Sequence, residues 1–357
     1  MSFVEFHRVS KTFGKTVAVE ELNFAVEQGE FFSLLGPSGC GKTTTLRMLA
    51  GFLTPTTGRI KVHGRDITDL PPEARGIGIV FQNYAIFPHM NVYDNIAFGL
   101  IERGEKKAEI RRKVGEALEQ VGLAGYESRF ERELSGGQKQ RVALARVLVV
   151  EPEILLLDEP LSALDKKMRE EMKYWIKDIQ KSVGISTIYV THDQSEALTM
   201  SDRIAVMNAG RMLQIGTPVE IYENPVSRFI AEFIGDSNLL AGRILSMDGT
   251  ACQIDLGGNA VVPSRIPSNA KVAVGDSIGL LLRPEVLRLT PSDEGETPYL
   301  SGEVIDEIYQ GSLRRYRVRA GIHEVTAEIP NRPELARLEP GDKVDLYWNS
   351  ESGAVVP

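Results

Sequence analysis

The chain has 357 residues, enough for two or three domains that each bury a core. Its composition, 42% hydrophobic and 25% charged, is typical of a globular protein and excludes a disordered or fibrous chain. The two cysteines are too few for a disulfide framework and suit a reducing compartment. Because the first residues lack a basic stretch followed by an apolar run, we expect no secretory signal.

Membrane insertion and nucleic-acid binding are both disfavoured by the sequence. The longest uncharged stretch, Gly76–Tyr93, is interrupted by polar residues and a proline, so it is a poor transmembrane span. Any membrane role is therefore expected to go through a partner. The net charge of −8 divides into −2 for residues 1–234 and −6 for residues 235–357. A nucleic-acid-binding protein would carry a basic surface instead.

Strands and helices are predicted to alternate through the first two thirds of the chain. Residues 31–35 form a short apolar run that ends in glycine, and apolar residues then recur at helical spacing over 46–53. Residues 154–157 and 185–191 are further strand candidates, and 168–179 carries one apolar helical face. Strands separated by helices predict a mostly parallel sheet covered on both faces.

A helical insertion and a change from helical to β-rich sequence complete the predicted organisation. Residues 101–121 show a purely helical pattern in a charged segment, which places a helical subdomain at about 84–150. After about residue 235, short β-rich pieces alternate with Gly, Pro, Asp and Asn. The predicted domains are therefore residues 1–234 and 235–357.

The C-terminal region also repeats itself weakly. Gly242–Ile244 parallels Gly302–Val304, and Gly275–Leu280 parallels Gly341–Leu346. This similarity predicts two related small β units that need neighbours to bury their faces. The alternative is that Gly-Asp turns recur by chance in a β-rich region.

A phosphate-binding loop is predicted between the first strand and the helix that follows it. The segment Gly36–Thr43 fits G-x-x-x-x-G-K-[ST] in the strand–loop–helix context that this motif requires. Glycines let backbone N–H groups turn inward, Lys42 would reach the β- and γ-phosphates, and Thr43 would offer a hydroxyl to Mg²⁺. The expected nucleotide-binding residues here are Gly36, Pro37, Ser38, Gly39, Cys40, Gly41, Lys42, Thr43 and Thr44. We expect amide dipoles and Lys42 to favour the Cys40 thiolate, the alternative being an inert filler position.

Two carboxylates follow the predicted buried strand at 154–157. Ligands bind at the carboxyl ends of strands in open α/β sheets, so Asp158 is expected to hold a metal ion and Glu159 to face the γ-phosphate. Alone, a strand that ends in Asp-Glu is usually a solvated turn. Beside a phosphate-binding loop, the pair predicts a catalytic site.

A second anion site is predicted at Leu134–Gln138, where Ser135, Gly136, Gly137 and Gln138 begin a helix. One ATP does not need two such loops from one subunit. With this loop the chain resembles the ATP-binding cassette (ABC) family, in which the signature loop completes the ATP site of the opposite subunit in a head-to-tail dimer.

Further residues match the family in order along residues 3–234. Phe13 resembles the aromatic residue that stacks on adenine, although tyrosine is more usual there, and Gln82 resembles the glutamine that contacts Mg²⁺ and the attacking water. Asp165 matches the loop that crosses the dimer interface, and His192 matches the γ-phosphate sensor. Taken singly, Phe13 would more often be a core residue, Gln82 a surface residue and His192 a strand-end histidine.

The branch of the family is inferred from the C-terminal region and from the absence of features that mark other branches. The segment between Gln82 and Ser135 is too short for the coiled coil of repair and condensation proteins, and the sequence has neither a second phosphate-binding loop nor fused membrane helices. Leu281–Glu285 and the paired Gly-Asp units resemble the oligonucleotide-fold-like (TOBE-type) domain of import cassettes. Residues 308–312 and 316–318 resemble the polyamine branch more than the sugar branch.

The resemblance implies an α/β P-loop NTPase cassette with a mostly parallel sheet and a helical insertion, followed by an all-β domain of paired OB-like barrels. It implies an ATPase that uses ATP and Mg²⁺ as a homodimer, bound to two permease subunits at the cytoplasmic face of the inner membrane. An extracytoplasmic solute-binding protein would act indirectly, and nucleic acid is not an expected partner. The alternative substrates are sugars, iron or oxyanions, with the C-terminal domain binding a regulatory effector or stiffening the dimer.

Overall fold

The computed structural model describes residues 2–258, 260–293 and 296–357, and the chain divides into two compact units after Pro218. The short helices α7 (Pro218–Glu223) and α8 (Arg228–Phe233) lie at the start of the second unit, before the boundary that we predicted near residue 235. Ala231 of α8 packs against Leu281, and the buried Arg283 guanidinium donates to the carbonyls of Ala231 and Ile234. These contacts explain why residues 219–234 group with the second unit.

The first unit is built on a six-stranded sheet in the order β10-β9-β3-β8-β7-β6. The five strands from β9 to β6 are joined by four parallel pairings, and β10 pairs with β9 antiparallel. Every residue of β3, β7 and β8 is buried, as expected for strands covered on both faces. The strands are β3 (Phe31–Leu35), β6 (Ile77–Val80), β7 (Ile154–Asp158), β8 (Ser186–Thr191), β9 (Arg203–Asn208) and β10 (Arg211–Gly216). The predicted parallel sheet is confirmed.

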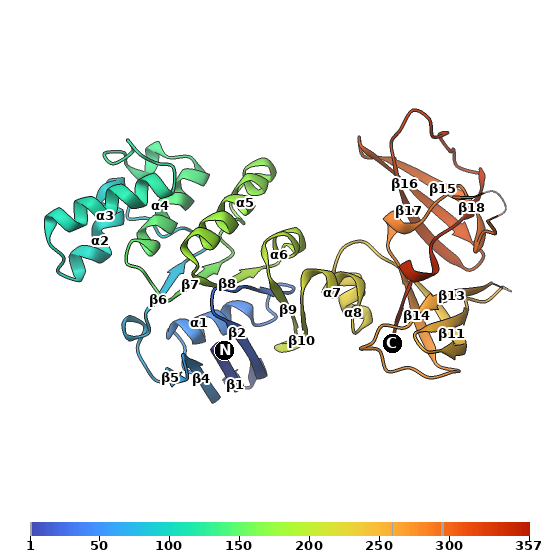
Figure 1. Ribbon diagram of the computed structural model, residues 1–357, viewed down its shortest axis with the longest axis horizontal. Coiled ribbons are helices and arrows are strands. Elements are labelled where there is room, and N and C mark those ends of the chain that lie inside the picture. Colours follow the sequence, from blue (N-terminus) through green and yellow to red (C-terminus); the bar gives the residue numbers. More distant parts are fainter. Residues whose placement is uncertain (1, 259, 294–295) are drawn as a thin grey trace. The chain divides into compact units, whose positions relative to one another are not determined.

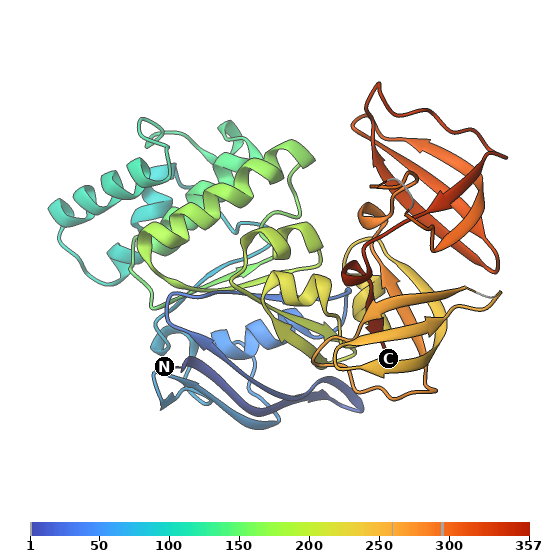
Figure 2. The same cartoon turned by 45° about the vertical axis from the view of Figure 1, so that its right-hand side comes forward.

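A four-stranded antiparallel sheet, which was not expected from the sequence, flanks the parallel sheet. Its order is β2-β1-β4-β5, and its strands are β1 (Ser2–Phe13), β2 (Thr16–Glu27), β4 (Thr57–Val62) and β5 (Arg65–Asp66). Helix α1 (Lys42–Ala50) lies between the two sheets (Figure 2), and one apolar core joins all three elements.

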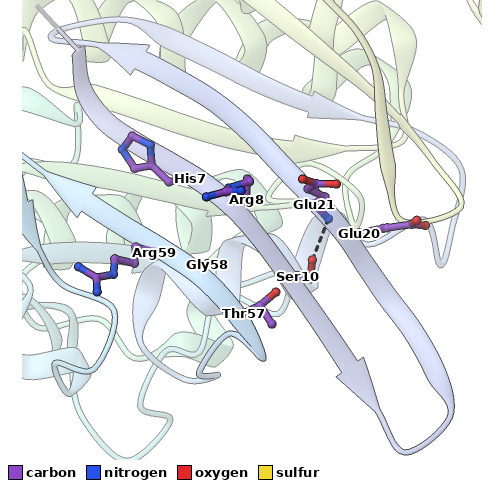
Figure 3. A pocket seen from close by; sticks show the side chains of 8 residues that line it. All are labelled: His7, Arg8, Ser10, Glu20, Glu21, Thr57, Gly58 and Arg59. Atoms are coloured by element: carbon purple, nitrogen blue, oxygen red, sulfur yellow. Dashed lines mark hydrogen bonds between the residues drawn. The ribbon is translucent and has the colours of Figure 1, made fainter.

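Bulges in β1 open a hollow of about 610 Å³ on this antiparallel sheet (Figure 3). Arg8 and Glu21 have left-handed backbones, with φ of 45° and 47°. A Cβ at Gly58 would lie 2.3 Å from the Arg8 carbonyl oxygen, so only glycine fits where β4 approaches β1 at this point. The hollow is therefore a product of strand irregularity, and it contains none of the predicted nucleotide-binding residues.

Helices cover the six-stranded sheet and also form a separate group. Helices α5 (Lys166–Val183) and α6 (Gln194–Met200) follow β7 and β8, whereas α2 (Val92–Glu102), α3 (Lys107–Gln120) and α4 (Gly136–Leu148) gather beside β6 (Figure 1). These three helices share their own apolar core and constitute the helical insertion. The segment predicted as purely helical at 101–121 is interrupted, because Gly104, with φ of 73°, turns the chain between α2 and α3.

The second unit contains two β assemblies with a common apolar core. The first is a closed barrel of β11 (Asn238–Asp248), β12 (Ala251–Asp255), β13 (Val261–Arg265), β19 (Ala354–Val356) and β14 (Ser277–Leu282). The second is a four-stranded sheet of β17 (His323–Pro330), β16 (Leu313–Ala320), β15 (Leu300–Tyr309) and β18 (Lys343–Leu346). The all-β prediction is confirmed, but of the paired barrels only the first is closed in the part of the chain that the structure describes.

The predicted internal repeat is confirmed by equivalent hydrogen bonds in the two assemblies. In the barrel, the Ile244 N–H donates to the Asp276 carbonyl at 3.1 Å, and the Gly275 N–H donates to the Ile244 carbonyl at 2.8 Å. In the sheet, Val304, Asp342 and Gly341 repeat this pair of bonds at 2.9 Å each. The Gly-Asp turns therefore occupy the same structural position in both units and do not recur by chance.

Candidate functional site

The predicted site residues of the first unit follow the carboxyl ends of parallel strands. Gly36 follows β3, Gln82 follows β6, Glu159 follows β7 and His192 follows β8. Because these strands are parallel neighbours, their carboxyl ends share one edge of the sheet, where ligands bind in open α/β folds.

The phosphate-binding loop joins β3 to α1 in a conformation that requires glycine. Gly39 and Gly41 have φ of 80° and 108°, in the left-handed region. A Cβ at Gly36 would lie 2.2 Å from the Met207 carbonyl oxygen, and one at Gly41 would lie 2.7 Å from the Ala18 carbonyl oxygen. Side chains are excluded at these positions, so the loop keeps its backbone N–H groups at the start of the helix.

Lys42 and Thr43 begin α1, and Thr43 connects the loop to the end of strand β7. The Lys42 side chain is 4% exposed and its ammonium donates to the carbonyls of Gly36 and Pro37 at 2.7 and 3.0 Å. The Thr43 hydroxyl donates to Asp158 Oδ1 at 3.1 Å. Thr43 and Asp158, which are 115 positions apart in the sequence, thus form one cluster of hard oxygen atoms.

The two carboxylates after β7 lie in different environments. Burial raises the pKa of Asp158, and the hydrogen bond from Thr43 partly opposes that shift. Glu159 has a left-handed backbone with φ of 46°, and its N–H donates to the Val190 carbonyl at 3.0 Å. His192 Nδ1 lies 3.1 Å from Glu159 Oε2, so the predicted catalytic pair is brought into contact.

Cys40 does not have the environment that we expected. Its side chain is 3% exposed, and burial raises the pKa of the thiol more than the nearby Lys42 ammonium lowers it. The expectation of a favoured thiolate was therefore wrong, because desolvation outweighs the charge and the amide dipoles at this position. The position within the loop remains as predicted.

Ser135 caps helix α4 through a reciprocal pair of hydrogen bonds. Its hydroxyl accepts from the Gln138 N–H at 3.3 Å, and Gln138 Oε1 accepts from the Ser135 N–H at 2.9 Å. This capping box explains why serine and glutamine stand three residues apart. A Cβ at Gly136 would lie 2.9 Å from Leu164, so glycine allows a close approach there. Ser135 belongs to the helical group, and within the described residues no hydrogen bond joins it to the loop at 36–43.

The other predicted residues lie at the surface of the same unit. Asp165 caps α5 by accepting from the Met168 N–H at 2.9 Å. Phe13 is 48% exposed at the end of β1, with the Lys11 ammonium 5.2 Å from its ring centroid, and so is not a core residue. Gln82 is exposed. Intermediate or full exposure is also found for Pro37, Ser38, Gly39, Thr43 and Thr44.

Glu196 supports the loop that carries His192, although it is not among the site residues expected from the sequence. Its carboxylate is 3% exposed and accepts from Thr191 Oγ1 at 2.6 Å and from the Tyr189 hydroxyl at 2.8 Å. Burial raises the pKa of Glu196, and these two hydrogen bonds oppose that shift. A glutamate in the first turn of a helix is usually exposed, so no signal in the sequence marks this one as buried.

Comparisons with known proteins agree with this geometry. Residues 19–162 match the ABC transporter family and residues 280–356 match the TOBE domain. The spermidine/putrescine import ATP-binding protein PotA of Acidothermus cellulolyticus is 51% identical over 95% of this chain and 89% of its own length. PotA of Rubrobacter xylanophilus is 48% identical over 97% of this chain and 92% of its own.

Two solved structures resemble about three fifths of this chain. The protein cbiO1 of Clostridium perfringens, part of the ABC transporter complex cbiONQ, is 33% identical with a TM-score of 0.59, covering 62% of this chain and 91% of its own. A dimeric ATP-binding cassette bound to ADP and Pi, in a post-hydrolysis state, is 30% identical with a TM-score of 0.54, covering 60% and 98%. The predicted family and fold are confirmed. The chain belongs to the ABC transporter family, as an import ATPase subunit with a C-terminal TOBE domain.

Proposed function

We propose that this chain hydrolyses ATP to drive the import of polyamines. The observation that carries the proposal is the cluster at the end of β7, where Thr43 of the phosphate-binding loop bonds to Asp158 and His192 contacts Glu159. The polyamine assignment is supported by the names of the relatives, which match nearly the whole chain, including its C-terminal unit.

The site residues divide nucleotide binding and hydrolysis between them. Backbone N–H groups of the loop and the Lys42 ammonium bind the phosphates, and the exposed Phe13 ring stacks on adenine. Lys42 would leave the carbonyls of Gly36 and Pro37 to do so. Glu159 orients the attacking water and receives its proton, while His192 holds Glu159 and contacts the γ-phosphate.

The residues present also fit Mg²⁺. This ion takes hard oxygen ligands and is usually held by one or two protein groups together with phosphate oxygens and water. The Thr43 hydroxyl and the Asp158 carboxylate, 3.1 Å apart, supply such groups, and Gln82 follows the neighbouring strand β6. When bound, Mg²⁺ would neutralise charge on the β- and γ-phosphates.

The site is proposed to be completed by a second copy of the chain. Ser135, Gly136, Gly137 and Gln138 form a second anion-binding helix start, and Asp165 lies at the exposed start of α5. A head-to-tail homodimer would place the helix start of one protomer against the nucleotide of its partner. The solved dimeric relative bound to ADP and Pi supports this arrangement.

Transport requires membrane partners. Within the described residues, no helix combines the length and apolarity needed to cross a bilayer. On the strength of the relatives, which are named as import ATP-binding proteins, we propose that the homodimer binds two permease subunits at the cytoplasmic face of the inner membrane and that an extracytoplasmic solute-binding protein delivers the substrate. Nucleic acid is not a proposed partner, because the net charge is −8.

The proposal is tested by uptake in cells that lack their own polyamine importers. The chain is expressed with candidate membrane and solute-binding subunits from the same genome, and uptake of radiolabelled spermidine is compared with uptake of maltose, ferric iron and sulfate. Spermidine uptake that disappears with Glu159→Gln supports the proposal. Uptake of only a sugar, iron or an oxyanion would assign the chain to that branch instead.

A further inference from the structure

The segment that follows Gln82 has an unfavourable backbone. Tyr84 and Ala85 have φ of 61° and 47°, so two consecutive residues other than glycine occupy the left-handed region. The Ala85 N–H donates to the Asn83 carbonyl at 2.6 Å, which closes a tight three-residue turn. Such conformations persist only where the surroundings hold them.

The Tyr84 side chain adds a second unfavourable feature. It is 8% exposed within the apolar core under β7 and β8, and its hydroxyl has no hydrogen-bond partner among the described residues. A buried hydroxyl without a partner disfavours the conformation that buries it. The segment therefore needs a specific stabilising contact.

Arg146, in the last turn of helix α4, supplies that contact. Its Nη1 donates to the Ala85 carbonyl at 2.8 Å and its Nη2 donates to the Tyr84 carbonyl at 3.2 Å. The guanidinium carbon also lies 4.9 Å from the centroid of the Phe87 ring. A planar guanidinium that bonds two successive carbonyls and lies over a ring fixes both the position and the orientation of the turn. A lysine ammonium, which is a single point charge, cannot do this.

The rest of the segment is held by helix α2 of the same helical group. Asn95 is 1% exposed, its Oδ1 accepts from the Phe87 N–H at 2.9 Å, and its Nδ2 donates to the carbonyls of Phe87, Met90 and Asn91 at 3.1, 3.1 and 2.9 Å. Residues 84–91 are thus bonded to α2 and α4, which lie together in Figure 1.

We propose that Arg146 is a positioning residue for ATP hydrolysis, which holds the strained turn at Tyr84 and Ala85 and thereby sets the place of Gln82. This inference rests on the proposed role of Gln82 at the nucleotide. Because Arg146 is on the helix that Ser135 begins, a shift of that helix is transmitted to Gln82 through the two carbonyl bonds.

The main test is Arg146→Lys, which keeps the charge and loses the planar guanidinium. We expect the kcat of the complete transporter to fall about tenfold, equivalent to about 1.4 kcal/mol in the barrier, with KM for ATP within about twofold of wild type. Hydrogen exchange of the amides at 82–87 should accelerate in the same variant. Arg141→Lys is the matched control, because Arg141 lies on the same helix, bonds to the Val121 carbonyl and lies against Trp175.

A rescue separates positioning from general stability. Glycine adopts φ above zero without strain, so Ala85→Gly in the Arg146→Lys background should restore at least half of the lost turnover. Ala209 also has a left-handed backbone, with φ of 46°, and Ala209→Gly is the control that should restore none. Equal rescue by both glycines, or a kcat unchanged in Arg146→Lys, would overturn the proposal.

A second variant covers the case in which Arg146→Lys fails to fold. Ala85→Val places a β-branched residue at φ of 47° and should reproduce the fall in kcat with Arg146 intact. Hydrogen exchange does not depend on hydrolysis. If the wild-type chain were inactive with ATP, the proposed function would fail, while unchanged exchange at 82–87 in Arg146→Lys would separately reject the role of Arg146.

Discussion

His192 Nδ1 lies 3.1 Å from Glu159 Oε2, and the two residues follow adjacent parallel strands, β8 and β7. The Glu159 backbone is left-handed, and its N–H bonds to the Val190 carbonyl. Strained conformations of this kind are retained where a function depends on them. The contact therefore orients the carboxylate that we assign to the attacking water.

The first prediction concerns this pair. Glu159→Gln removes the proton acceptor and keeps the shape, so ATP should still bind while hydrolysis falls by about 10² to 10⁴-fold. His192→Ala should also lose turnover and keep nucleotide affinity. Steady-state hydrolysis and equilibrium binding of a fluorescent ATP analogue measure the two effects separately.

A similar pair on β1 provides the control. His7 Nε2 lies 2.7 Å from Glu5 Oε2, outside the phosphate-binding loop and the strand ends that carry the site. Glu5→Gln should leave hydrolysis within about twofold of wild type, since loss of a surface pair has little effect. Retention of more than a third of wild-type turnover by Glu159→Gln would reject the assignment of Glu159.

The second prediction tests whether each ATP site is shared. Lys42→Ala removes a phosphate contact from one face of the site, and Ser135→Arg blocks the other face. A mixture of the two variants contains dimers with one intact composite site and should recover ATP-dependent dimerisation, measured by sedimentation. If Lys42→Ala protein dimerised with ATP on its own as wild type does, the shared site would be contradicted.

The sequence predicted the parts of the site that depend on backbone geometry. The glycine spacing of 36–41 requires a loop that only glycine can form, and the structure shows clashes for a Cβ at Gly36 and Gly41. Strand ends also follow from apolar runs, so the common edge that carries Asp158, Glu159 and His192 could be inferred from parallel pairing alone. The repeat in the C-terminal unit was visible because its turns need Gly and Asp.

Other features could not be inferred, because they depend on contacts and burial that only the folded chain shows. The antiparallel sheet of β1, β2, β4 and β5 was missed, since its strands are irregular and β1 contains bulges. The environment of Cys40 was misjudged, because the motif shows the nearby lysine but not the burial. Arg146 and Glu196 resemble ordinary helix residues until their partners, 61 and 5 positions away, are known.

The third prediction follows from the correction at Cys40. A raised pKa leaves less thiolate at neutral pH than a free cysteine has, so a maleimide should react with the native chain at least about ten times more slowly than with the unfolded chain. The rate should rise with pH. A Cys252→Ser background removes the other buried thiol. Mass spectrometry follows labelling, and rapid labelling at pH 7 that ATP does not slow would contradict the burial.

The fourth prediction concerns pH and stability at Asp158. Burial raises the pKa of Asp158 in the folded chain above the ordinary 3.8. The contribution of Asp158 to the free energy of unfolding is therefore fully present below pH 3.8 and is lost as the pH rises through the folded pKa. Asp158→Asn should therefore increase the free energy of unfolding at pH 7, measured in urea without nucleotide or Mg²⁺, and the gain should shrink toward pH 4. Hydrolysis should fall by at least about 100-fold, because the group that we propose as a ligand of Mg²⁺ is lost.

Asp66 offers a matched control of opposite sign. It also accepts from a threonine hydroxyl, that of Thr68, but hydrogen bonds lower the pKa of Asp66. Its contribution to stability is present above the unfolded pKa and lost as pH falls through the folded one. Asp66→Asn should therefore reduce the free energy of unfolding at pH 7 and leave hydrolysis nearly unchanged. The same sign for both variants would contradict the assigned environments.

The last prediction addresses docking of the membrane subunits on the segment 83–91, for which packing inside the unit is the alternative. Phe87 is half-buried, with its ring centroid 4.9 Å from that of Phe98, so a charge at Phe87 would also disturb packing. Met90 is half-buried, and its described hydrogen bonds involve only its backbone, so Met90→Glu is the cleaner variant.

Met90→Glu should leave the isolated subunit folded and able to hydrolyse ATP. A carboxylate in an apolar groove for a partner helix would be desolvated without a counter-charge, so co-purification with the permease subunits and transport should both be lost. Lys107→Glu, on the exposed start of α3, is the control that should keep both. A lowered unfolding temperature in Met90→Glu would favour the packing role, and normal transport by a folded variant would exclude the groove.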